Sequence, residues 1–122
     1  MFAVGCSSLG GISKDSPLEA KKERAGQRAQ ARWDALIRGD VNAAYEFLSP
    51  GTRAVTSQAV YRGKIKPGMW RSAKVQSVDC EADVCSVKLL LDYDARRVRG
   101  IETPLTEKWI IESGNAWYAD QN

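Results

Sequence analysis

The stretch that decides the fold class is the alternating segment CSVKLLLDY, residues 85–93. Its odd-numbered residues, from Cys85 to Tyr93, are apolar or aromatic, and most of the residues between them are polar. Successive side chains of a β-strand point to opposite faces, so this pattern predicts a strand with one face in the core. A strand with one polar face is typical of an antiparallel sheet that is solvated on one side.

Similar alternation predicts three further strands around this one. They are expected at residues 70–78, 103–113 and 116–119, with a basic loop at residues 95–100. In the third of the four strands, Glu107 shares a face with Trp109. Because short connections join these strands, they are expected to pair in sequence order as an antiparallel meander.

Helical spacing of apolar residues dominates the front half of the chain. Residues 18–38 contain no proline and place Ala25, Ala29 and Trp33 on one face, which predicts a long helix. A second helix is expected at residues 41–48, and a third short one after Pro50. Helices followed by sequential strands predict an α+β fold, with the N-terminal helices packed on a curved antiparallel four-stranded sheet.

Length and composition limit the functional classes. The chain has 122 residues and 43% hydrophobic residues, which suits one domain with a core. The net charge of +3 is too small to indicate a nucleic-acid partner. The stripe Arg24, Arg28 and Arg32 could rest on anionic lipid or polymer, but it is interpreted as a solvated helix face. The chain has no histidine, which excludes imidazole-based catalysis and removes the commonest zinc ligand. No cofactor or metal is expected.

Two of the three cysteines, Cys80 and Cys85, flank a short acidic turn between two predicted strands. A tight hairpin would bring them opposite each other, within the range that a disulfide needs. The alternative is a metal or redox pair, but two thiols alone cannot complete a zinc shell, and catalytic dithiols usually have a different spacing. A structural disulfide is therefore predicted, which indicates an oxidising compartment.

The third cysteine lies in the segment Ala3-Val4-Gly5-Cys6, which resembles the cleavage site of bacterial lipoprotein signal peptides. The resemblance implies that Cys6 is lipidated, and residues 1–17 are then a remnant signal followed by a flexible tether. The alternative is that Cys6 is a stray thiol. The lipoprotein interpretation predicts a periplasmic protein that is anchored by lipid, at the outer membrane because Ser7 follows the cysteine.

The segments WDALIRGD (residues 33–40) and AAYEFLSP (residues 43–50) resemble the opening of a nuclear transport factor 2-like domain. The segments LTEKWI (residues 105–110) and GNAWY (residues 114–118) are similar to the last two strands of that superfamily, which includes ketosteroid isomerase and the SnoaL-like cyclases. The resemblance implies one domain at residues 18–122 with a cone-like fold. The open end of such a cone often forms a pocket or a dimer surface.

Glu107 is the main candidate for a functional residue. Alternation places it on the inward face with Trp109, where an ionised carboxylate must find a partner or become neutral. Arg53, just after the break at Pro50, is the expected partner, and Tyr45 and Tyr93 are expected to line the same cavity.

Two roles for Glu107 stay open. In the structural role, the Glu107–Arg53 ion pair fixes the sheet against the helices. In the catalytic role, Glu107 is a general base, and Tyr45 or Tyr93 stabilises an oxyanion, as the resemblance to ketosteroid isomerase implies. The catalytic positions of that family cannot be matched residue by residue to this chain, so the structural role is favoured.

The expected function is therefore non-catalytic: an exported lipoprotein domain that binds a small apolar ligand or an envelope partner protein. One alternative is a small-molecule isomerase, dehydratase or hydrolase that uses Glu107 with a tyrosine. The other is a structural module that forms a homodimer. Contact with the membrane would come from the lipid anchor at Cys6, and no nucleic-acid partner is expected.

Overall fold

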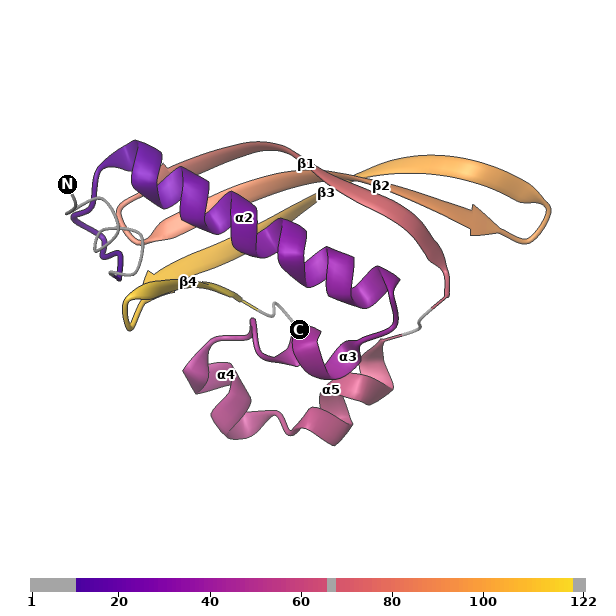
Figure 1. Cartoon of the computed structure of the whole chain (residues 1–122), viewed down its shortest axis with the longest axis horizontal. Coiled ribbons are helices and arrows are strands. Elements are labelled where there is room, and N and C mark those ends of the chain that lie inside the picture. Colours follow the sequence, from indigo (N-terminus) through magenta and orange to yellow (C-terminus); the bar gives the residue numbers. More distant parts are fainter. Residues whose placement is uncertain (1–10, 66–67, 120–122) are drawn as a thin grey trace, which may run out of the picture.

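Four helices pack on a four-stranded antiparallel sheet in the computed structural model, which describes residues 11–65 and 68–119 (Figure 1). The long helix α2 (Leu18–Ile37) crosses one face of the sheet, and three short helices follow it beside the last strand. The predicted α+β class, with N-terminal helices on an antiparallel four-stranded sheet, is confirmed. None of the helices in these two ranges is long and apolar enough to cross a membrane.

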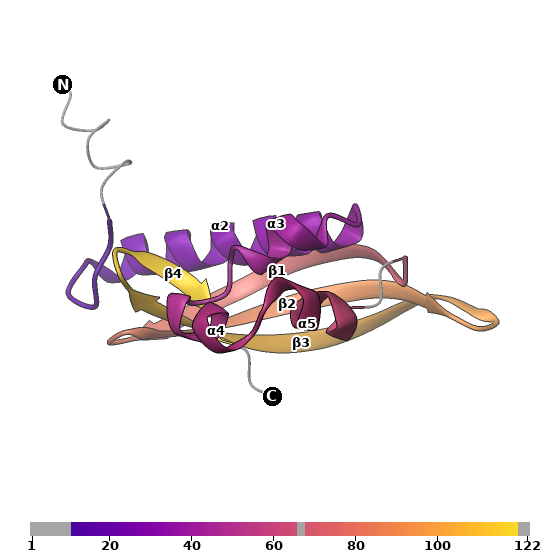
Figure 2. The same cartoon turned by 90° about the horizontal axis from the view of Figure 1, so that it is seen from below.

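The sheet is a meander in which each strand pairs with the next one along the chain. Its strands are β1 (Trp70–Glu81), β2 (Val84–Ala95), β3 (Val98–Glu112) and β4 (Asn115–Tyr118). The register places Val87 opposite Glu107 and Cys85 opposite Trp109, so these side chains share the inward face. Figure 2 shows α2 on one side of β1, β2 and β3, and no helix of the described residues covers the opposite face of these strands.

Helix α2 packs closely on the sheet because small residues lie on its inward face, beside the larger Trp33 and Leu36. Ala25 and Ala29 are completely buried, and Trp33 is 5% exposed. Gly26 brings the helix close to β1, since a Cβ atom there would lie 3.3 Å from the Val78 side chain. The predicted apolar face of this helix is therefore the face that forms the core.

The three short helices begin at polar caps. In each case the cap side chain accepts a hydrogen bond from the backbone N–H three residues later, which satisfies one of the free donors of the first turn. The helices and their caps are α3 (Val41–Tyr45) with Asp40, α4 (Pro50–Val55) with Ser49, and α5 (Gln58–Lys64) with Ser57.

The third predicted helix is in fact two helices. Thr56 has extended backbone angles, which end α4, and Ser57 then begins α5. The break turns Val55 and Val60 outward, with exposed fractions of 86% and 55%, whereas Tyr61 is buried. Of Val55, Val60 and Tyr61, only Tyr61 reaches the core.

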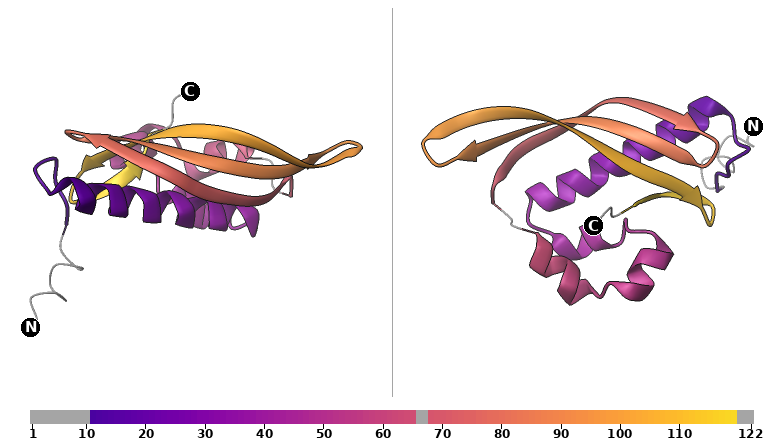
Figure 3. Two further views of the ribbon diagram at one scale, coloured as in Figure 1. Left: turned by 90° about the horizontal axis from the view of Figure 1, so that it is seen from above. Right: turned by 180° about the vertical axis from the view of Figure 1, so that it is seen from behind.

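The hairpin of β2 and β3 is longer than expected, and the predicted basic loop at residues 95–100 is wrong. Only Arg96 and Arg97 form the turn, while the residues on either side belong to the strands. Arg96 has a φ of +51°, which suits a two-residue hairpin turn. The hairpin consequently projects well beyond the helices (Figure 3).

The segment before α2 and the turn between β1 and β2 are connected through Lys21, which is 6% exposed. Its Nζ donates to the carbonyl oxygens of Lys14 and Ala82, at 3.0 and 2.9 Å. In addition, the backbone N–H of Ile12 donates to the carbonyl of Gly114 at 3.0 Å. Residues 11–17 are therefore joined directly to the turn between β3 and β4, and through Lys21 to the turn between β1 and β2.

Cys80 and Cys85 form a disulfide across the turn between β1 and β2, as the spacing predicted. The two residues are only five positions apart, so the bridge restricts a short loop of the unfolded chain. We expect the double variant Cys80→Ala/Cys85→Ala to lose roughly 2 kcal/mol of unfolding free energy, measured by urea denaturation. Dithiothreitol should lower the stability of the wild type by a similar amount and leave the variant unchanged. Equal stability of variant and oxidised wild type would contradict a stabilising bridge.

Candidate functional site

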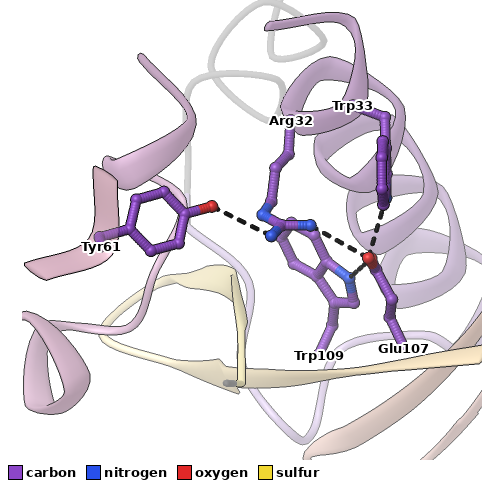
Figure 4. Close-up of polar contacts among 5 residues, drawn as sticks. All are labelled: Arg32, Trp33, Tyr61, Glu107 and Trp109. Carbon is purple, nitrogen blue, oxygen red and sulfur yellow. Dashed lines mark hydrogen bonds and ion pairs between the residues drawn. The ribbon is translucent and has the colours of Figure 1, made fainter. Parts of the chain in front are cut away.

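The buried carboxylate of Glu107 is surrounded by three side-chain donors (Figure 4). Its Oε2 accepts from Arg32 Nη1 at 3.0 Å and from Trp33 Nε1 at 2.8 Å. Its Oε1 accepts from Trp109 Nε1 at 3.1 Å. Glu107 and Arg32 are each only 4% exposed. The group is thus a buried ion pair with both carboxylate oxygens occupied, and we call these four residues with Tyr61 the buried cluster.

The secondary structure explains how these residues meet. Arg32 and Trp33 are neighbours on α2, where the helix faces the sheet. Glu107 and Trp109 are two positions apart on β3, so strand alternation turns both toward the helix. Tyr61 reaches the group from α5, and Arg32 Nη2 donates to its hydroxyl oxygen at 3.0 Å. The buried cluster therefore joins α2, α5 and β3.

Arg32 is also stacked on aromatic rings. Its guanidinium carbon lies 3.8 Å from the ring centre of Tyr118 and 5.6 Å from that of Trp33. Burial alone lowers the pKa of the Arg32 guanidinium, but the charge of Glu107, with smaller contributions from Tyr61 and Tyr118, outweighs this and raises the pKa. Arg32 consequently stays charged whenever the domain is folded.

This arrangement does not suit general-base catalysis. A base must reach the proton that it removes, whereas three donors hold the Glu107 carboxylate inside the core, where it is only 4% exposed. Two open grooves, of about 640 and 710 Å³, lie elsewhere, one between α2 and β1 and one around the turn between β1 and β2. Glu107 lines neither of them.

The structure pairs Glu107 with Arg32, and Arg53 lies elsewhere. Arg53 forms an ion pair with Glu46, with 3.2 Å between its Nη1 and the carboxylate, and its Nε donates to the carbonyl of Leu48. The predicted Glu107–Arg53 pair is therefore wrong. The position of α4 explains the difference, because the cap at Ser49 directs this short helix along the outside of the domain, and none of its residues is buried.

The two tyrosines proposed for catalysis do not contact Glu107. Tyr45 donates to the carbonyl of Thr56 at 2.6 Å, and its ring centre lies 5.7 Å from that of Tyr61. Tyr93 accepts from Thr103 at 3.4 Å. It lies six residues along β2 from the position opposite Glu107, or about 20 Å. Of the residues predicted to share a site with Glu107, only Trp109 contacts it.

Sequence reasoning missed Arg32, Trp33 and Tyr61. The available signal was the arginine stripe of α2, which was interpreted as a solvated face. Arg32 directly precedes Trp33, a predicted core residue, and both side chains reach Glu107 from α2. The predicted lipidation site, Cys6, lies outside the described residues. Within residues 11–65 and 68–119, no group of three or more acidic or cysteine side chains is placed to hold a metal ion.

A second group of arginines and aromatic rings lies beside the buried cluster. The guanidinium carbon of Arg28 lies 4.7 Å from the ring centre of Phe47 and 4.9 Å from that of Trp117. Arg53 approaches the same Trp117 ring at 5.4 Å. Partial burial lowers the pKa of the Arg28 guanidinium, and repulsion from Arg24 and Arg53 lowers it further. We call Arg28, Arg53, Phe47 and Trp117 the arginine–tryptophan surface.

Comparison with known proteins adds a fold similarity. No family model and no curated protein sequence matches this chain. Among solved structures, the chain is similar to the solution structure of a SEC-C motif containing protein from Rhodopseudomonas palustris, with a TM-score of 0.57 and 16% sequence identity. The similarity covers 89% of this chain and 79% of that protein. At this level of identity it shows a shared fold and nothing about activity.

This finding corrects the expected membership in the nuclear transport factor 2-like family. The segments behind that resemblance do form helices on a sheet, but the structural match is to a SEC-C motif containing protein, and no family model supports the assignment. The resemblance rested on a helix, a Gly-Asp turn and two strand patterns, which many α+β domains share. The chain is an α+β domain with the fold of that Rhodopseudomonas palustris protein.

Proposed function

We propose that the protein is a non-catalytic domain of the bacterial cell envelope, which binds a small ligand or an envelope partner on its surface. The observation that carries this proposal is that three side chains donate hydrogen bonds to the buried carboxylate of Glu107. Arg32, Trp33 and Trp109 occupy both oxygens of the only carboxylate within the described part of the chain that is buried. Glu107 then serves the fold, and function resides on the surface.

Two features support an envelope location. The disulfide between Cys80 and Cys85 is of the kind that persists in oxidising compartments such as the periplasm. The segment that resembles a lipoprotein cleavage site supplies the second argument, and lipidation at Cys6 stays a prediction.

Surface binding is favoured by the chemistry of the arginine–tryptophan surface. Trp and Arg are enriched where proteins bind their partners, because each offers a large contact area with a polar group. Here Trp117 is only partly buried and carries two guanidinium groups beside its ring.

Complementation separates the binding function from catalysis. A deletion strain would carry either the wild-type gene or the variant Arg32→Met/Glu107→Leu, which removes the buried acid together with its partner. We expect this variant to restore growth under envelope stress, such as detergent or EDTA, as well as the wild type does. Tyr93→Phe, which removes a hydroxyl proposed for catalysis, should restore it too.

Folding of each variant at the growth temperature would be verified by circular dichroism on the purified chain. A folded Arg32→Met/Glu107→Leu variant that behaves like the deletion would mean that the carboxylate takes part in chemistry. That outcome would overturn the non-catalytic assignment and favour the isomerase, dehydratase or hydrolase alternative.

A further inference from the structure

The charge of Arg28 is not neutralised within the described part of the chain. The side chain is half-buried on α2, and its Nε donates to the carbonyl of Ala116 at 2.6 Å. No carboxylate among residues 11–65 and 68–119 lies within ion-pair distance of it. A partly desolvated cation without a counter-charge is costly, so the position favours the arrival of an anion.

Its neighbour on the same helix stripe shows the contrast. Arg32, one turn further along α2, is neutralised by Glu107 at 3.0 Å. Arg28 instead has like charges nearby, since Arg24 and Arg53 both repel it. The protein thus places two guanidinium groups, Arg28 and Arg53, around a single indole ring, although repulsion opposes this arrangement.

The aromatic rings fix the direction of these groups. The Arg28 guanidinium contacts both Phe47 and Trp117, and the bond to Ala116 occupies its Nε. Its two terminal nitrogens have no hydrogen-bond acceptor among the described residues. A planar guanidinium held in this way presents two parallel N–H donors, which is the geometry that carboxylate and phosphate groups accept.

Arg53 can contribute a second set of donors. Its partner Glu46 is 64% exposed, and an exposed ion pair of this kind contributes little to stability. An arriving oxyanion can therefore displace Glu46 from Arg53 at small cost. The bond from Arg53 Nε to the carbonyl of Leu48 keeps the side chain beside Trp117 meanwhile.

We propose that Arg28 and Arg53, held around Trp117, form a binding site for an oxyanion, the carboxylate or phosphate group of the ligand. This inference rests on the proposed binding function and names the chemistry that its surface recognises. A free small molecule and a lipid headgroup can both present such a group, and the experiment below separates these two sources.

The test is a titration of the full chain with inorganic phosphate, followed by the NMR signals of the arginine Nε–H groups and the tryptophan indoles. We expect saturable shifts of Arg28, Arg53 and Trp117. Arg28→Gln and Arg53→Gln should each weaken binding about tenfold or more, in line with the loss of a charge-assisted bond. Arg97→Gln is the matched control, because it removes one positive charge from the distant hairpin turn and should leave binding unchanged.

Two further variants keep the result interpretable. Arg28→Lys retains the charge but loses the planar pair of donors, so it should bind phosphate more weakly than the wild type and more tightly than Arg28→Gln. If Arg28→Gln fails to fold, as judged by the dispersion of its amide signals, Arg53→Gln carries the comparison alone. NMR shifts that do not saturate with phosphate would overturn the proposed site. Equal losses of phosphate affinity in Arg53→Gln and Arg97→Gln would do the same.

Vesicles separate the two sources of the oxyanion. Binding to vesicles that contain phosphatidylglycerol, absent with pure phosphatidylcholine and abolished by Arg53→Gln, would identify a headgroup as the ligand. Phosphate binding without vesicle binding would identify a free ligand. If phosphate does not bind at all while the Arg32→Met/Glu107→Leu variant still complements the deletion, the oxyanion site is wrong and the non-catalytic function stands.

Discussion

Replacing Glu107 by leucine will lower the free energy of unfolding by about 3–5 kcal/mol. The change leaves the Arg32 guanidinium charged in a position that is only 4% exposed. It also removes the acceptor from the indole N–H groups of Trp33 and Trp109. Urea denaturation followed by tryptophan fluorescence and by circular dichroism would measure the loss.

The double variant Arg32→Met/Glu107→Leu is the control for this explanation. Removing both members of a buried ion pair replaces two desolvated charges by apolar side chains of similar size, which is often close to neutral. We expect the double variant to be more stable than Glu107→Leu alone, although Tyr61 then loses a donor. A different result is a double variant that loses as much free energy of unfolding as Glu107→Leu and Arg32→Met lose in sum. That result would show that the charge pair is not the source of the effect.

Trp109→Ala will lower the free energy of unfolding by about 3–5 kcal/mol. The indole is completely buried, and it is the largest such side chain among the described residues. Its ring centre lies 5.9 Å from that of Tyr118 and 6.4 Å from that of Phe47, so alanine leaves a cavity between β3, β4 and the segment that follows α3. Thermal and urea unfolding would measure the effect.

Trp109→Phe separates the cavity from the lost hydrogen bond. Phenylalanine refills most of the space but cannot donate to Glu107 Oε1, so about 1–3 kcal/mol of the loss should remain. Trp70→Ala is the matched comparison, because Trp70 is only partly buried near the start of β1. Equal losses at Trp70 and Trp109 would contradict the position of Trp109 at the centre of the core.

The alternation of apolar and polar residues predicted the sheet well. This alternation follows directly from the burial of one face of each strand, so it is visible within a short stretch of sequence. The alternation from Cys85 to Tyr93 matches a strand whose inward residues are buried as far as Leu91. The missed features depend on single backbone positions. The positive φ of Arg96 shortens the turn between β2 and β3, and the extended angles of Thr56 divide a helix in two.

The candidate site was predicted only in part, for a different physical reason. Alternation on β3 put Glu107 inside, and the need for a buried positive partner was correct. The choice between Arg53 and Arg32 depends on the distance of α2 from β3 and the distance of α4 from β3. No sequence pattern within either helix contains these distances. A partner 75 positions away in the sequence can be recognised only once the helix is placed on the sheet.

The family assignment was wrong for a related reason. A helix, a Gly-Asp turn and a second helix record local chemistry: Gly39 has a φ of +84°, and Asp40 caps α3. Such signals mark where helices end and begin in many unrelated domains. They therefore identified the elements correctly without identifying the family.

The meander of short turns has a consequence for the order of folding. Each hairpin brings together residues that are close in sequence, whereas α2 reaches β3 only through contacts such as Arg32 with Glu107, which span most of the chain. Local pairings form faster than distant ones, so we expect the strands to associate before α2 docks. Until then the apolar face of β2 and β3 is open to other chains. The speed of helix docking therefore sets how long each new molecule is exposed to aggregation.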